Sequence, residues 1–133
     1  MKKLFLTVVA MLGATTLFAQ IDVVATFQQA TANAKAANYT EAIAQFQSII
    51  DASWDIEEPD ANQQKAFAGS KKFIVTCYNK MGIAAYNAKN YEEAIANFSE
   101  AANLAELYED VAAMNKNRAY VGQMYQAQGA DAF

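Results

Sequence analysis

Carboxylates are the groups in this sequence that cluster densely enough to suggest chemistry. Asp55, Glu57, Glu58 and Asp60 lie close together in one short segment. Carboxylate oxygens supplied by a loop are the ligands that calcium prefers. The spacing lacks the ligand positions of an EF-hand and its central glycine, so the sequence predicts a solvated acidic loop over residues 54–60 rather than a metal site.

The other ingredients of a catalytic site are missing. The sequence has no histidine, the usual general base and the commonest metal ligand, and its one cysteine cannot form a thiolate cluster for zinc. No glycine-rich phosphate-binding loop occurs. The remaining acidic groups lie near predicted helix starts, where the helix dipole stabilises them: Glu92, Glu93, Glu106, Glu109 and Asp110. We therefore predict a non-enzyme that uses no cofactor and no metal.

Two single residues leave more than one interpretation open. Cys77 lies in an apolar stretch and is predicted to be a small buried residue, with a redox or intermolecular role as the alternative. Trp54 borders the acidic loop and is predicted to pack beneath it. The alternative for Trp54 is an exposed anchor for a binding partner.

Residues 1–19 have the pattern of an export signal. Lys2 and Lys3 precede an apolar run, and Ala19 ends it at a small-residue cleavage motif. We predict a Sec signal peptide cleaved after Ala19 and a periplasmic or secreted mature protein. A retained membrane anchor is the alternative, although the run is shorter than the about 20 apolar residues that span a bilayer.

The mature chain is acidic. Loss of Lys2 and Lys3 leaves eight basic and 14 acidic residues, a net charge of −6. Proteins bind nucleic acids through lysine and arginine contacts with phosphates. Neither a nucleic acid nor an anionic membrane is therefore an expected partner.

The strongest internal signal is a duplicated segment. Residues 39–46 (YTEAIAQF) and 91–98 (YEEAIANF) share tyrosine, alanine, isoleucine and phenylalanine at a separation of 52. Asn38 and Asn90 precede the two copies, each with a glutamate three residues later, and predict capping boxes. The apolar spacing forms one stripe on a helix and none on a strand. Long helices are also predicted over about 61–88 and from about 108 onward, so the predicted fold class is all-α.

The stretch from Met81 to Ala101 resembles a tetratricopeptide repeat. That family places a glycine in the first helix, a tyrosine and an alanine at the turn, and an aromatic residue and an alanine in the second helix. The second copy holds Gly82, Tyr91, Ala94, Phe98 and Ala101 at these places. The first copy keeps Tyr39, Ala42 and Phe46, with Ala30 and Ile49 at the other two.

The resemblance implies a short α-solenoid of stacked antiparallel helix-turn-helix repeats. Repeat 1 is expected over about 21–53, repeat 2 over about 61–106 and a partial repeat 3 over about 108–133. The third copy rests on a match of residues 124–133 to 77–86, at a separation of 47. Both separations exceed the family's about 34 residues, which implies extended first helices. We expect a chain truncated at its C-terminus, with self-association through the open repeat; a solvating end helix is the alternative.

In this family the first helices of successive repeats line a concave groove that binds a partner. Alignment places these residues in it: Phe27, Thr31, Ala34, Lys35, Asn79, Ile83, Tyr86, Asn87, Gln123, Gln126 and Ala130. Packing positions are the alternative for Ile83 and Tyr86. One subgroup clamps a peptide's C-terminal carboxylate with lysine and asparagine, but Phe27 and Thr31 occupy those places, so that mode is not expected.

The expected function is non-catalytic protein or peptide binding, or scaffolding, in the cell envelope. One alternative is an accessory repeat region of a larger exported protein. Another is a helical protein that binds a glycan or a small molecule in an aromatic pocket, for which Tyr86 and Trp54 are the candidates.

Overall fold

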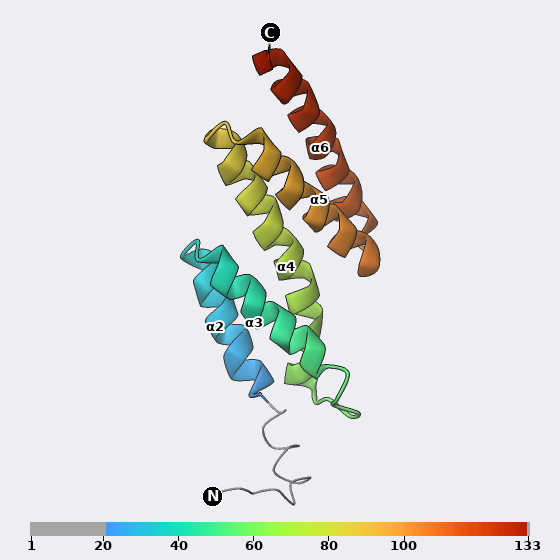
Figure 1. Ribbon diagram of the computed structural model, residues 1–133. Helices are drawn as coiled ribbons and strands as arrows, with labels where there is room; N and C mark the ends of the chain where they lie inside the picture. Colours follow the sequence, from blue (N-terminus) through green and yellow to red (C-terminus); the bar gives the residue numbers. More distant parts are fainter. Residues whose placement is uncertain (1–20, 133) are drawn as a thin grey trace, which may run out of the picture.

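The structure, a computed structural model, describes residues 21–132, and regular structure in that range is helical throughout (Figure 1). The helices are α2 (Val23–Lys35), α3 (Tyr39–Ala52), α4 (Ala61–Asn87), α5 (Tyr91–Leu107) and α6 (Val111–Ala132). The predicted all-α class is confirmed for these residues. The predicted signal peptide, residues 1–19, lies outside the described part of the chain.

The helices pack mainly against their neighbours along the chain. α2 and α3 form one antiparallel pair, α4 and α5 form a second, and α6 lies along α5 (Figure 1). α4 is the longest helix and contacts each of the other four. Its first half runs beside α3 and its second half beside α5, so α4 joins the two pairs into one stack (Figure 1).

Three helix–helix turns share one backbone geometry. The second residue after each helix end is left-handed, with φ of 65° at Ala37, 61° at Lys89 and 62° at Glu109. In all three turns the next amide donates to the carbonyl five residues earlier at 2.8 Å, which is the bond of a Schellman motif. The shared geometry reverses the chain tightly and sets consecutive helices antiparallel.

The two predicted capping boxes differ in outcome. The Asn90 side chain accepts from the backbone amide of Glu93 at 3.2 Å, so the predicted N-cap forms. The reciprocal bond of a capping box does not form there, because the Asn90 backbone amide donates to Ala85 O at 2.8 Å. The prediction for Asn38 is wrong, because this residue makes no side-chain cap bond. Its side-chain Nδ2 instead donates to Asn33 Oδ1 at 3.4 Å. A complete capping box forms at Asp60 and Gln63, where the two reciprocal bonds measure 2.8 and 2.9 Å.

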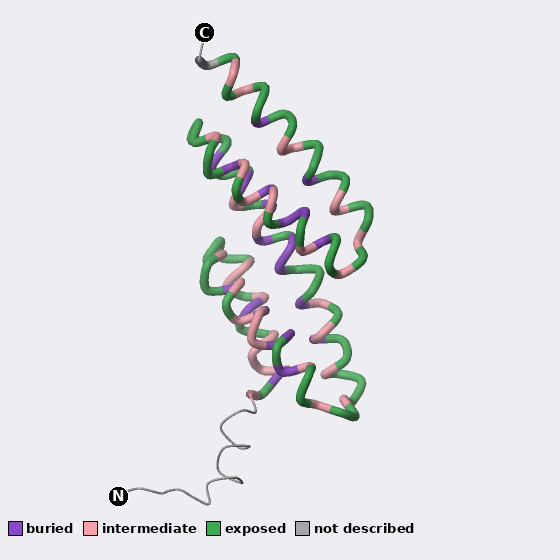
Figure 2. Tube along the Cα trace, turned by 45° about the vertical axis from the view of Figure 1, so that its right-hand side comes forward, coloured by how far each residue is buried: buried purple, intermediate pink, exposed green. Residues whose placement is uncertain are grey.

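Buried residues lie mainly on the sides of the helices that face other helices (Figure 2). Phe46 and Phe98, the equivalent phenylalanines of the duplicated segments, are the largest fully buried side chains. The ring of Phe46 lies 5.8 Å from that of Phe73, and the ring of Phe98 lies 4.8 Å from that of Tyr120. Phe73 and Tyr120 are 47 residues apart, the separation found between the second and third sequence copies. Corresponding positions thus make corresponding aromatic contacts.

The segment between α3 and α4 places its large side chains differently from the prediction. Trp54 is 84% exposed, so the prediction that it packs beneath the loop is wrong. The Trp54 amide donates to Asp51 O at 3.2 Å in a tight turn at the end of α3. Ile56 instead packs against the core, and the indole stays in solvent.

Candidate functional site

A groove opens between α2 and α4, with a volume of about 370 Å³. This lies within the range of about 300–1,000 Å³ typical of ligand sites. We call it the α2–α4 groove, and its lining residues are Thr31, Ala34, Lys35, Tyr39, Phe73, Thr76, Cys77 and Lys80. Both long walls are helices, which hold the lining side chains at fixed spacing.

The α2 wall combines small side chains with one cation. Thr31 is half-buried, and its hydroxyl donates to Phe27 O at 2.8 Å. Lys35 is exposed in the last turn of α2. This wall therefore presents mainly methyl groups and an ammonium group.

The α4 wall supplies an aromatic surface and a second cation. Phe73 is 37% exposed, and its ring stacks on Phe27 at 5.9 Å. Thr76 and Lys80 follow at helical spacing and are both exposed. The arrangement suits an apolar group held against Phe73 with an anionic group nearby.

Cys77 lies at the bottom of the groove and is buried, as the sequence predicted. Burial raises the pKa of its thiol from 9.0 to about 11, although Lys80 acts in the opposite direction. A thiol with this pKa stays protonated at neutral pH, and the thiolate is the nucleophilic form. The groove therefore contains no activated cysteine.

The native Cys77 thiol is expected to resist Ellman's reagent at pH 8, and unfolding in guanidinium chloride should expose it to rapid labelling. The raised pKa means that the folded state favours the protonated thiol. Its contribution to stability is full below pH 9.0 and is lost as the pH rises through about 11. Equal labelling rates for native and unfolded protein would contradict this burial.

The structure separates eight of the eleven residues that alignment placed in the family's groove. Thr31 and Lys35 line the α2–α4 groove. Asn79 is buried, and its amide donates to Asn117 Oδ1 at 2.8 Å, so it serves the contact between α4 and α6. The other five are exposed and do not line this groove: Ile83, Tyr86, Asn87, Gln123 and Gln126.

Sequence alignment missed the α4 wall of the groove. It placed the wall at residues 79–87, whereas the structure brings Phe73, Thr76 and Lys80 opposite α2. The extension of α4 at its N-terminal end shifts the segment that faces α2 toward that end. The helical spacing of Phe73, Thr76 and Lys80 was the available signal, because residues three and four apart share a helix face.

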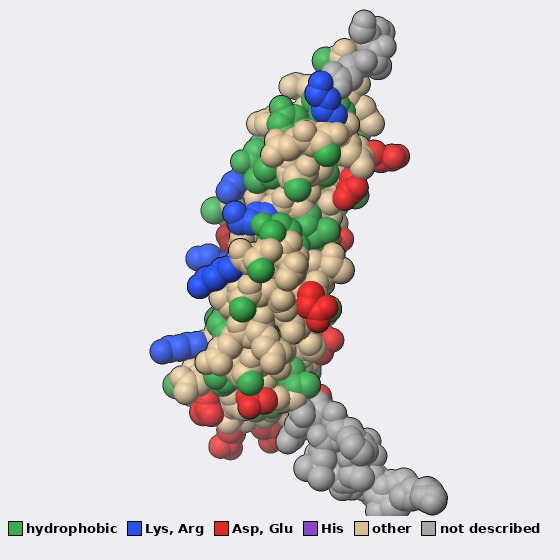
Figure 3. All heavy atoms as spheres, turned by 90° about the vertical axis from the view of Figure 1, so that its left-hand side faces the viewer, with side chains coloured by type: hydrophobic (Ala, Val, Ile, Leu, Met, Phe, Trp, Pro, Cys, Tyr) green, Lys and Arg blue, Asp and Glu red, His purple; other side chains and the backbone are tan. Residues whose placement is uncertain are grey.

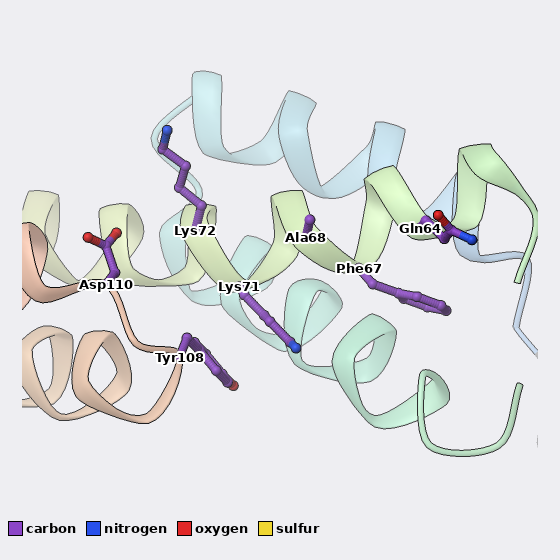
Figure 4. A pocket seen from close by; sticks show the side chains of 7 residues that line it. All are labelled: Gln64, Phe67, Ala68, Lys71, Lys72, Tyr108 and Asp110. Carbon is purple, nitrogen blue, oxygen red and sulfur yellow. The ribbon is translucent and has the colours of Figure 1, made fainter. Parts of the chain in front are cut away.

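A second hollow, which we call the α4 pocket, has a volume of about 520 Å³. Its lining residues are Gln64, Phe67, Ala68, Lys71, Lys72, Tyr108 and Asp110 (Figure 4). The Lys71 ammonium lies 5.7 Å from the centre of the Tyr108 ring, within cation–π range. Burial, followed by the Asp51 carboxylate, raises the pKa of the Tyr108 hydroxyl, which therefore stays protonated.

Charge is segregated between neighbouring helices. α4 carries four lysines, Lys65, Lys71, Lys72 and Lys80, and no acidic residue, whereas α5 carries four glutamates and no basic residue. Within residues 21–132 the one ion pair joins Arg118 to Glu106 at 3.1 Å. Figure 3 shows basic side chains gathered along one edge and acidic ones mostly along the opposite edge.

The aromatic pocket considered from the sequence does not form. Trp54 lines a different hollow, together with Lys71 and Tyr108. Tyr86 lies 15 residues beyond Lys71 on the same helix, which is about 22 Å along the axis. Trp54 and Tyr86 therefore cannot contact one small ligand.

The described residues contain no cluster of three or more potential metal-ligating side chains among His, Cys, Asp and Glu. No helix between residues 21 and 132 is long and apolar enough to cross a membrane.

Comparison with known proteins gives no assignment: the chain matches no family model, and no curated protein or solved structure is significantly similar to it.

Proposed function

We propose that this chain is a non-catalytic binding module of tetratricopeptide type, and that the α2–α4 groove holds a protein or peptide partner. The observation that carries the proposal is the groove itself. Its walls come from the first helices of two successive helix pairs, with Phe73 partly exposed and Lys35 and Lys80 near it. Aromatic surface with charged groups around it is the usual make-up of a protein-binding hot spot.

The stacking of the helices supports the solenoid part of the proposal. Each helix packs on the next one in the chain, and α4 also contacts α2 and α6. Contacts between neighbouring units are the defining feature of repeat proteins. The matched aromatic pairs, Phe46 with Phe73 and Phe98 with Tyr120, support equivalent units.

The proposed place of action is the cell envelope or the exterior. This part rests on the basic, apolar and small-residue segments that end at Ala19. An exported module without catalytic groups would act by holding other components together, so scaffolding of an envelope assembly is the proposed role.

Filling the groove should abolish partner capture. Thr76→Trp places an indole in the α2–α4 groove from an exposed position. The mature protein, immobilised and exposed to envelope extract, is expected to retain a specific partner, and the Thr76→Trp variant is expected to lose it.

The matched control is Ala96→Trp, which adds the same side chain at an exposed position of α5. It should retain the partner, because position 96 lies outside the groove. Equal retention by both folded variants would refute the groove as the binding site. Circular dichroism melts of both proteins establish that each is folded.

A further inference from the structure

We propose that the partner presents an acidic, extended segment that crosses α4 from the α2–α4 groove to the α4 pocket. This inference rests on the proposed function and specifies the chemistry of the partner. It requires cations without ion-pair partners along the path and an apolar contact surface at each end. The two ends must also be close enough for an extended chain to span.

The cations along this path have no carboxylate at ion-pair distance. α4 and α5 pack together and carry opposite charges, yet the four lysines of α4 form no ion pair with the glutamates of α5. All four lysines are instead exposed to solvent. Lysines without ion-pair partners on one helix attract and orient an anionic partner although the whole chain is acidic.

The two apolar contact surfaces lie on opposite sides of α4. Lys80 lines the α2–α4 groove and Lys71 lines the α4 pocket. Nine residues separate them, about two and a half helical turns, which places them on opposite sides of α4. Phe73 provides apolar surface in the groove, and Phe67 provides it in the pocket.

Lys72 lies on the ridge between these two hollows. It lines the α4 pocket, and its carbonyl accepts from the hydroxyl of Thr76, which lines the groove, at 3.3 Å. Figure 4 shows its side chain directed away from that of Lys71. A carboxylate crossing the ridge would meet Lys72 first.

The spacing of the hollows defines the ligand further. Their α4 lining residues are centred about eight positions apart, or about 12 Å along the axis. The helix width of about 10 Å separates them at right angles to the axis, so the two hollows lie about 16 Å apart. An extended chain advances about 3.3 Å per residue, so about five residues span the path. The segment should therefore carry two apolar side chains about five residues apart, with carboxylates between them.

A peptide segment fits these features better than other anions do. It supplies carboxylates and apolar side chains on one narrow chain. A membrane surface is broad and cannot enter two hollows on opposite sides of a helix ridge. A nucleic acid would bring phosphates but no aliphatic side chains for Phe73 and Phe67.

The test uses a rhodamine-labelled decapeptide with two leucines five residues apart and glutamate at all eight remaining positions. Fluorescence anisotropy with the mature protein should show binding that weakens as salt is added. A matched peptide with glutamine in place of glutamate should bind at least about tenfold more weakly, because it cannot pair with the lysines. A third peptide, with lysine in place of glutamate, should not bind.

Charge-matched variants locate the contact. Lys72→Ala with Lys80→Ala should weaken binding of the glutamate peptide about tenfold. Lys89→Ala with Lys116→Ala removes the same charge elsewhere and should change binding less than about twofold. Equal losses from the two double variants would overturn the proposal, since only overall charge would then matter.

The peptide panel also separates this inference from the proposed function. Equal binding of the glutamine and glutamate peptides, with NMR shifts at Thr76, would overturn the acidic class while leaving the groove as a binding site. If none of the peptides bound, the proposal of an acidic partner segment would be overturned. The groove itself would then stand or fall with the Thr76→Trp capture experiment. Stronger binding to phosphatidylglycerol vesicles than to the glutamate peptide would also overturn the proposal.

Discussion

Phe98→Ala is expected to lower the free energy of unfolding by about 3–5 kcal/mol, the usual cost of removing a buried phenylalanine side chain. Phe98 is 1% exposed, and its ring stacks on Tyr120 with 4.8 Å between centroids. Domains of this size are stable by only about 5–15 kcal/mol. The variant should therefore unfold at a markedly lower urea concentration, as measured by circular dichroism at 222 nm.

Glu100→Ala is the control for the loss at Phe98. Glu100 lies two residues further along α5 and is exposed. Its replacement should change the free energy of unfolding by no more than about 0.5 kcal/mol. If the two variants were equally stable, the buried face assigned to α5 would be wrong.

Gly82→Ala is expected to destabilise the protein by about 1–3 kcal/mol, a typical cost of overpacking a core. A Cβ atom at position 82 would lie 2.7 Å from two ring atoms of Phe98 and 2.8 Å from a third. That ring is enclosed and cannot move aside without disturbing Tyr120. The clash should outweigh the about 1 kcal/mol by which alanine is preferred over glycine in a helix.

Gly122→Ala tests the same substitution where space is open. A Cβ atom at Gly122 would have no neighbour within 4 Å. Only the helix preference then acts, so this variant should gain about 0.5–1 kcal/mol in the same urea titration. A gain at Gly82 would contradict the close approach of α4 and α5 there, and a loss at Gly122 would contradict the open space at that position.

Helix periodicity and the duplicated segment were sufficient to predict the helices and their core aromatics. Phe46 and Phe98 are buried because each belongs to an apolar stripe repeated at helical spacing. Such stripes must face another helix, so local sequence determines which side is covered. Exact cap geometry depends on competition between nearby polar groups. The Asn38 side chain donates from Nδ2 to Asn33 Oδ1 and makes no cap bond to α3.

The groove could be predicted only in part, because its two walls depend on different kinds of information. Thr31 and Lys35 follow from the repeat alignment, since α2 has the expected length and place. The α4 wall depends on how far that helix extends beyond the repeat unit, and thus on which segment packs beside α2. Phe73 and Lys80 enter the groove for this reason.

The exposure of Trp54 also could not be predicted, because two large side chains compete for the same place in the tertiary structure. Both Trp54 and Ile56 could have covered the end of the core, and composition alone does not decide between them. The tight turn after Ala52 directs Trp54 outward, and Ile56 then fills the space against the core. The indole lies beside Lys71 and Leu107 in a hollow separate from the α2–α4 groove.

Photocrosslinking in intact cells tests the central claim most directly, because it reports what occupies the α2–α4 groove in place. Benzoylphenylalanine at position 76 sits in the groove, and the same group at position 96 sits on the exposed surface of α5. Irradiation should join the protein to one discrete partner from position 76 and not from position 96. The account would be contradicted by the same crosslinked species arising from both positions, or from position 96 alone.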